Sequence, residues 1–186
     1  MRLFLALPLP LDVATVAAAL LPDLPGLRRV RPELLHITLA FLGAVEAERL
    51  AEVAAASATA AATQARFVIT LDRAGRFPEG GAPRVVWLGM GAGATESANL
   101  AIAIRAALAA RGLPFDDKPY RPHLTLARVK PDADRPTARG IAAAAERMRP
   151  SALQFTADAI VLFESALSPK GPRYTPRATA PLERAP

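Results

Sequence analysis

The chain has 186 residues, of which 52% are hydrophobic and 22% are charged. This composition supplies enough apolar surface for a globular core and excludes a disordered protein, and the length suits one domain over residues 1–186, or two small lobes that share a core. Because the sequence contains no cysteine, it excludes disulfide frameworks, thiolate metal sites and cysteine nucleophiles. The net charge of +6 favours an anionic partner such as nucleic acid or phosphate, although the basic residues are scattered and form no tail.

The amino-terminal segment resembles a secretory signal only in part. Arg2 precedes an apolar run, but Pro8 and Pro10 interrupt that run and Asp12 follows it directly. Residues 3–11 are also far fewer than the ~20 apolar residues that a membrane span needs. We therefore expect the first strand and first helix of a soluble, cytoplasmic protein.

Further along the chain, apolar alternation and turn residues predict a succession of strands and helices. The expected strands cover residues 2–7, part of 25–33, 36–42, 66–77, 84–90, 123–129, 152–165 and 172–180. The expected helices cover a segment that starts at the prolines and ends at 21, and residues 45–65, 94–112 and 134–149. The third of these helices has Thr95 or Ser97 as its expected cap and Gly112 just past its end.

Two pairs of neighbouring strands have the arrangement of hairpins. These are residues 66–77 with 84–90, and residues 152–164 with 173–180. Hairpins join antiparallel strands, whereas parallel strands need a crossover. The order of elements therefore predicts an α+β fold with largely antiparallel pairing, rather than a doubly wound parallel sheet.

A tetrapeptide of the form H-x-T-L occurs twice, and its two copies contain both histidines of the chain, His36 and His123. Side chains alternate across a strand, so His36 and Thr38 share one face, as do His123 and Thr125, while the aliphatic residues are buried behind. Two copies so far apart in the sequence can meet only in a duplicated fold. We therefore expect a pseudo-symmetric pocket with two imidazoles and two hydroxyls.

Two imidazoles without a carboxylate suit acid–base chemistry at phosphorus. Histidine titrates near neutrality, so one ring can accept a proton from the attacking water while the other donates a proton to the leaving oxygen. The hydroxyls of Thr38 and Thr125 can donate hydrogen bonds to the non-bridging oxygens. A strained cyclic phosphodiester of RNA type suits this arrangement because it needs no metal to react.

Other sites are disfavoured, and we expect neither a metal nor a cofactor. Two histidines without a third ligand fall short of a zinc site, and no G-x-S-x-G elbow is present. Gly89, Gly91 and Ala94 match the dinucleotide-binding pattern, but the acidic residue expected about 20 positions later is missing. We interpret this segment as a glycine-rich turn.

Several segments resemble one known family over nearly the whole chain. They are MRLFLALPLP, LLHITLAFLG, RFPEGGAPRVVWLG, YRPHLTLARV and LFESALSPKGPRYTP, and they are similar to the RNA 2′,3′-cyclic phosphodiesterases, also called 2′-5′ RNA ligases, of the 2H phosphoesterase superfamily. The resemblance implies a monomer of two intertwined, pseudo-two-fold lobes. It also implies hydrolysis of 2′,3′-cyclic phosphates on RNA ends, such as tRNA fragments, to 2′-phosphates. The same chemistry with an RNA 5′-hydroxyl in place of water would give a 2′-5′ linkage.

The resemblance also implies roles for the motif residues. His36 would be the acid on the O3′ leaving group and His123 the base on water, although the near-symmetry allows the reverse. Arg128, in HLTLAR, would help to hold phosphate; strand alternation puts it opposite His123, so it needs a bulge or a strand end to turn inward. The alternative for Arg128 is an ordinary surface arginine.

Four aromatic or basic residues outside the motifs complete the expected site and its surroundings. Phe4 could stack on a base, or could equally be a core residue. Tyr120 and Arg121 precede the second motif and are expected at the rim, while Trp87 is assigned to the core. Two further functions stay open: a module that binds RNA ends or phosphate without turnover, and a cyclic phosphodiesterase that acts on a small nucleotide.

Overall fold

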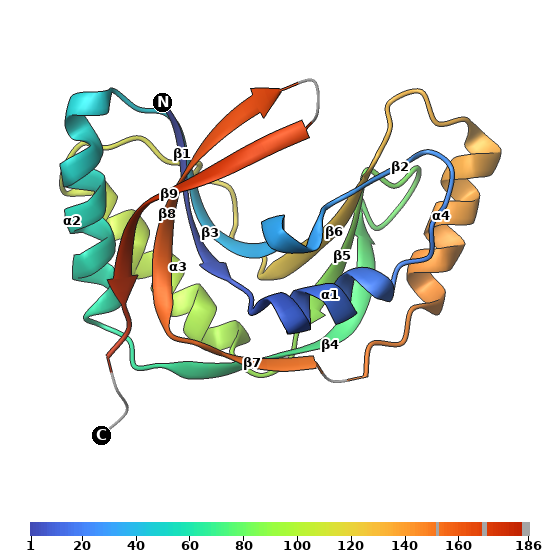
Figure 1. Cartoon of the computed structure of the whole chain (residues 1–186), viewed down its shortest axis with the longest axis horizontal. Helices are drawn as coiled ribbons and strands as arrows, with labels where there is room; N and C mark the ends of the chain where they lie inside the picture. Colours follow the sequence, from blue (N-terminus) through green and yellow to red (C-terminus); the bar gives the residue numbers. More distant parts are fainter. Residues whose placement is uncertain (152, 169–170, 184–186) are drawn as a thin grey trace.

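The computed structural model describes residues 1–151, 153–168 and 171–183, and Figure 1 shows its course. The expected start of a strand at Ala152 lies outside these residues. The strands are β1 (Arg2–Pro8), β2 (Leu27–Arg29), β3 (His36–Ala44), β4 (Phe67–Phe77), β5 (Val85–Met90), β6 (His123–Val129), β7 (Leu153–Ala157), β8 (Ala159–Ser168) and β9 (Gly171–Pro181). The α-helices of the described residues are α1 (Leu11–Ala19), α2 (Leu50–Ala61), α3 (Ala94–Ala109) and α4 (Arg135–Arg147).

Within the described residues the strands form one sheet in the order β7-β4-β5-β6-β3-β1-β8-β9, and β2 pairs with the free part of β6. The pairings between these strands are antiparallel. The order has two matching halves that meet where β3 pairs with β6, at Ile37 and Leu124. The two-lobed, pseudo-two-fold α+β fold expected from the sequence is therefore confirmed.

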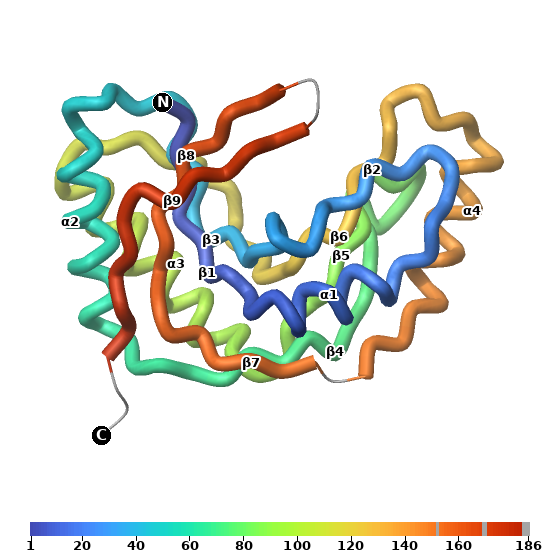
Figure 2. The backbone as a smooth tube through the Cα atoms, in the orientation of Figure 1, coloured from blue at the N-terminus to red at the C-terminus, as the bar shows by residue number. Residues whose placement is uncertain are grey.

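The helices cover the outside of the two halves, and two of them cross between halves. α2 and α3 pack together beside β3, β8 and β9, while α1 and α4 lie beside β7 and β4 (Figure 1). α1 follows β1 in the chain but contacts β7 of the other half, and α3 follows β5 but contacts β3. The chain path in Figure 2 shows that neither half is built from one continuous segment.

The core lies where the apolar runs predicted it. Leu3, Leu5 and Leu7 of β1 are buried, as are Ile37 of β3 and Leu124 of β6. β1 is apolar and buried at five consecutive positions, so neither of its faces is left to solvent, and β3 and β8 pair with its two edges. A continuous apolar run of this length is what a fully buried strand requires.

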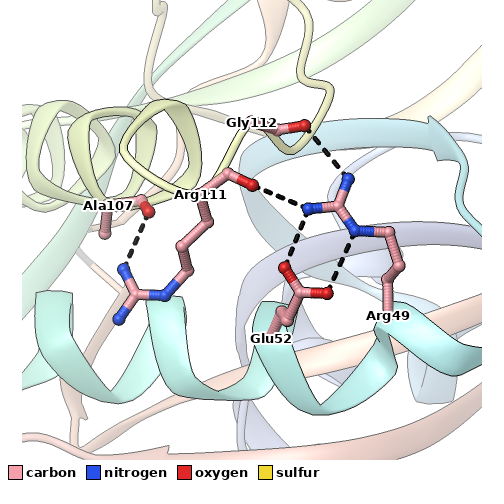
Figure 3. Close-up of polar contacts among 5 residues, drawn as sticks. All are labelled: Arg49, Glu52, Ala107, Arg111 and Gly112. Carbon is pink, nitrogen blue, oxygen red and sulfur yellow. Dashed lines mark hydrogen bonds and ion pairs between the residues drawn. The ribbon is translucent and has the colours of Figure 1, made fainter.

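A network of polar contacts fixes the ends of α2 and α3 relative to each other (Figure 3). The Arg49 guanidinium binds the Glu52 carboxylate, with Nη2–Oε2 at 2.8 Å, and also donates to the carbonyls of Arg111 (2.7 Å) and Gly112 (3.0 Å). These carbonyls lie just past the carboxyl end of α3, where a cation is stabilising. Gly112 has φ +60°, as expected for a residue just past a helix end.

Two expectations about element boundaries are wrong. α3 begins at Ala94, directly after Gly93, which has φ +81°. Neither Thr95 nor Ser97 caps this helix with its side chain. A Cβ on Gly93 would lie 2.7 Å from the Val68 carbonyl oxygen, so close backbone packing decides this helix start. The single strand expected over 152–165 is two strands, because β7 pairs with β4 and β8 pairs with β1, in opposite halves of the sheet.

The expected helix over 45–65 is shorter than predicted, because a 3-10 turn at Ala47–Arg49 precedes α2. No helix in the described ranges is both long and apolar enough to cross a membrane.

Candidate active site

The two strands that carry the H-x-T-L motifs, β3 and β6, pair side by side at the centre of the sheet. Ile37 faces Leu124 in an antiparallel pair, and both are fully buried, so the histidines and threonines lie on the opposite face. Antiparallel pairing at this point brings His36 toward Thr125, and Thr38 toward His123. The structure thus brings together the four polar residues that the sequence singled out.

Both imidazoles are held by the same local hydrogen bond. His36 Nδ1 lies 2.8 Å from the Leu34 carbonyl oxygen, and His123 Nδ1 lies 2.7 Å from that of Arg121. A carbonyl can only accept, so each Nδ1 carries a hydrogen, and Nε2 of the neutral ring is left as an acceptor. Each ring can therefore take up a proton at Nε2 without losing its anchor.

Burial lowers the pKa of both histidines. The pKa of His36 is lowered from 6.5 mainly by desolvation and further by the positive charges of His123 and Arg128, while the hydrogen bond to the Leu34 carbonyl partly offsets this. The pKa of His123 is lowered by desolvation and by Arg128. Because a charge on one ring disfavours a charge on the other, the pair takes up one proton more readily than two.

A bulge in β6 turns Arg128 toward the histidines. β5 and β6 pair at Trp87–Thr125 and next at Val86–Ala127, so Leu126 is an extra residue. One extra residue reverses the alternation beyond it, which places Arg128 on the face of Thr125. From this position the positive charge of Arg128 contributes to the lowered pKa of both histidines. β3 has the same irregularity, since Leu39 is extra between the positions that pair with β1.

Phe77 is a site residue that the sequence analysis did not single out. It meets the His123 ring edge-on, with centroids 5.2 Å apart, and the Arg121 guanidinium lies 5.6 Å from the Phe77 centroid. Trp87, assigned to the core, is only partly buried; it lies 5.1 Å from Phe77, on the strand position opposite Thr125. Phe77 and Trp87 together support His123 from the β4–β5 side. A phenylalanine at a strand end carries no sequence signal for such a role.

A second aromatic group surrounds His36. The Phe4 ring lies 4.9 Å from the imidazole and stacks on Phe163 at 5.3 Å, and Tyr174 meets His36 edge-on at 5.3 Å. Phe4 is only 3% exposed, so it packs beneath His36 and offers little surface to a base. Tyr174 was not predicted; burial raises its pKa, so its hydroxyl stays protonated at neutral pH.

A pocket of about 230 Å³ opens beside Thr38 and His123. Its walls include residues of β3, β4, α3 and the segment before β6, namely Phe41, Phe77, Arg105, Asp116, Lys118, Tyr120 and Arg121. Tyr120 is largely buried, which raises the pKa of its phenol. Arg121 is exposed at the rim, and its Nη1 lies 3.6 Å from Oε1 of Glu79. In the described residues, no three His, Cys, Asp or Glu side chains lie together as a metal site.

Comparison with known proteins shows the family of this chain. A family model described as the 2′-5′ RNA ligase superfamily matches residues 11–168. An RNA 2′,3′-cyclic phosphodiesterase of Thermus thermophilus is 36% identical over 94% of this chain and 87% of that protein. The protein of the same name from Escherichia coli K12 is 37% identical over 71% of this chain and 73% of its own.

Solved structures share the whole fold. The crystal structure of TT0787 of Thermus thermophilus superposes with a TM-score of 0.80 at 33% identity, covering 99% of both chains. That of E. coli LigT complexed with 3′-AMP gives 0.73 at 30% identity, covering 97% of both. The fold and its paired motifs define a two-histidine phosphoesterase. The chain belongs to the 2′-5′ RNA ligase superfamily, which confirms the family expected from the sequence and its enzyme class, cyclic phosphodiesterase.

Proposed function

We propose that the protein hydrolyses 2′,3′-cyclic phosphates at RNA ends to 2′-phosphates by paired-histidine catalysis. The observation that carries the proposal is the placement of two imidazoles, each anchored through Nδ1 and with Nε2 available for a proton, on one face with two threonine hydroxyls. The names of the relatives from T. thermophilus and E. coli support the substrate. RNA ends, including those of tRNA fragments, are thus the proposed partners.

In the proposed reaction, Nε2 of neutral His123 takes a proton from water as its oxygen attacks phosphorus. The bond from phosphorus to O3′ breaks in line, and the charged His36 ring donates its Nε2 proton to O3′. The products are a 2′-phosphate and a 3′-hydroxyl, and proton exchange with solvent restores the pair. Thr38, Thr125 and Arg128 stabilise the negative charge on the non-bridging oxygens.

The same step accommodates a second nucleophile. An RNA 5′-hydroxyl in the place of water would give a 2′-5′ phosphodiester, with the same bond to O3′ broken and the same proton transfers. No nucleoside triphosphate is needed, because the strained ring supplies the driving force.

The decisive experiment is product analysis on cytidine 2′,3′-cyclic phosphate and on short RNAs with the same end, with and without EDTA. We expect the 2′-phosphate in both conditions, and loss of at least 10²-fold in His36→Ala and in His123→Ala, since each group contributes 10²–10⁴-fold. Full activity in either folded variant would exclude the mechanism. Tight binding of phosphorylated RNA ends without turnover would instead identify a binding module.

A substrate with sulfur in place of O3′ assigns the acid. A thiolate leaves without protonation, so the variant that lacks the acid recovers activity on this substrate, whereas the variant that lacks the base does not. We expect recovery in His36→Ala.

A small cyclic nucleotide is the second candidate substrate. It is favoured by the solved structures of the LigT relative with 3′-AMP and with ATP, both single nucleotides. Comparison of kcat/KM between mononucleotide and RNA substrates separates the two.

A further inference from the structure

Arg28 lies beside Arg128 on the face of the sheet that carries the histidines. β2 pairs with β6 so that Leu27 faces Val129, Arg28 faces Arg128 and Arg29 faces Ala127. Residues that face each other in an antiparallel pair point to the same side, with Cβ atoms about 4.5–5.5 Å apart. Because the bulge at Leu126 turns Arg128 toward the histidines, Arg28 points to that side too.

A row of facing residues across four strands confirms that Arg28 lies on the face of the sheet that carries the histidines. Phe77 faces Val85, Val85 faces Arg128, and Arg128 faces Arg28. At one end of the row, the Phe77 ring touches the His123 ring. The row therefore lies on the site face along its length, and Arg28 is its outer end.

The neighbouring Arg29 has the opposite orientation. It faces Ala127, which is fully buried and lies on the helix side of the sheet with Val86. Its guanidinium donates to the Ala18 carbonyl at the end of α1. Arg28 and Arg29 thus carry the same charge on one short strand but point to opposite sides.

Arg28 and Arg128 form a like-charged pair. Facing like charges destabilise a sheet unless an anion lies between or beside them. Within residues 1–151, 153–168 and 171–183, neither guanidinium has a carboxylate within 4.0 Å, whereas Arg49, Arg76 and Arg177 do. Both side chains are exposed, so they are available to a ligand.

The other half of the sheet lacks this pair. The sequence after the first motif is L-A-F and after the second L-A-R, so Phe41 stands at the position of Arg128. The backbone beside Phe41 belongs to Asp116, whose N–H donates to the Phe41 carbonyl at 2.8 Å. The facing pair of arginines therefore lies at the β6–β2 end of the site.

We propose that Arg28 binds the RNA phosphodiester that lies 5′ to the terminal nucleotide, and so gives the enzyme a preference for RNA over mononucleotides. The proposal rests on the proposed function. Arg128 lies within reach of the histidines and takes the reacting phosphate, while Arg28, one strand further out, takes the next phosphate. A mononucleotide has no phosphate to occupy this position.

The test compares Arg28→Ala, Arg28→Lys and the charge-matched control Arg29→Ala on cytidine 2′,3′-cyclic phosphate and on a trinucleotide with the same end. In Arg28→Ala we expect unchanged kcat/KM on the mononucleotide and a ~10-fold loss on the trinucleotide, mostly in KM. The slope of log(kcat/KM) against log salt for the trinucleotide should fall by about 0.7, the value for one phosphate contact on a single strand. Arg28→Lys should keep most of the preference, and Arg29→Ala all of it.

Binding of a trinucleotide that ends in a 2′-phosphate, followed by fluorescence anisotropy, measures the contact without turnover. An equal loss on both substrates, or an unchanged salt slope of binding in Arg28→Ala, would overturn the proposal. Absence of hydrolysis by the wild-type protein would contradict the proposed function alone, because the anisotropy slopes still decide whether Arg28 contacts the second phosphate.

Discussion

Gly75 on β4 leaves the space that Trp87 on β5 occupies, and Gly75→Ala tests whether this packing supports the site. A Cβ at position 75 would lie 2.5 Å from Trp87 Cη2 and closer still to Cζ2, whereas ordinary contacts begin at 3.4 Å. The indole must therefore move by about 1 Å. Overpacking of this kind costs ~1–3 kcal/mol, and for a chain of this length each kcal/mol lowers the melting temperature by about 2–4 °C.

The displacement should reach the chemistry through two contacts. Trp87 lies 5.1 Å from Phe77, which lies 5.2 Å from His123. A misplacement of about 1 Å remote from the reaction can cost up to 10²-fold, so we expect kcat of Gly75→Ala to fall by ~10- to 100-fold. Thermal melting and steady-state hydrolysis of cytidine 2′,3′-cyclic phosphate measure the two effects.

Two further variants make this prediction specific. Trp87→Phe in the Gly75→Ala background removes the atoms that clash and should recover part of both losses, giving a favourable coupling energy. Gly80→Ala, in the turn after the same strand, meets nothing within 4 Å and should leave stability and kcat unchanged. Wild-type stability and kcat in Gly75→Ala would refute the reasoning, and a loss that Trp87→Phe does not relieve would place the strain elsewhere.

Three other perturbations have signs that follow from the structure. Arg128→Met removes a positive charge that lowers the pKa of His36 and His123. The basic limb of the pH profile of kcat/KM should therefore move to higher pH, and the maximal kcat/KM should fall. A basic limb at the wild-type pH would contradict this prediction. Because folding lowers the pKa of both histidines, the unfolded chain binds more protons than the folded chain below pH 6.5, and the free energy of unfolding should fall as pH drops through 6.5. In His36→Gln this fall should be less steep. Urea titrations at pH 7.5 and 5.5 measure both. Gly140→Ala, inside α4 with nothing within 4 Å, should raise the free energy of unfolding by ~0.5–1 kcal/mol, and an unchanged urea midpoint would argue against it.

The proposed reacting centre can be predicted from the sequence because it depends on alternation within single strands. His36 with Thr38, and His123 with Thr125, share a face whatever the rest of the fold does. The requirement for a bulge before Arg128 follows from the same alternation, and the structure has that bulge at Leu126. These inferences need no knowledge of which strands pair.

The residues that surround the motif side chains cannot be predicted from the sequence in this way, because their positions depend on the register between strands that are distant in the chain. Phe77 touches His123 only because β4 pairs with β5 and β5 with β6 at particular positions. Tyr174 reaches His36 through the β8–β9 hairpin, and Arg28 reaches Arg128 through β2. A shift of one residue in any of these pairings would turn the side chain to the other face.

The broken symmetry of the two motifs bears on the roles of the histidines. Antiparallel pairing at Ile37–Leu124 leaves His36 at the end of the site that continues to Arg128, and His123 at the end where the pocket of about 230 Å³ opens.

If the RNA backbone lies along the arginines, its terminal ribose, which carries O3′, enters from the His36 end. An in-line nucleophile must then approach from the opposite side, where His123 lines the pocket. On this proposed course of the RNA we expect the acid at His36 and the base at His123, as the family resemblance implies, and the acid–base roles then depend on the same arginines that are proposed to select the substrate.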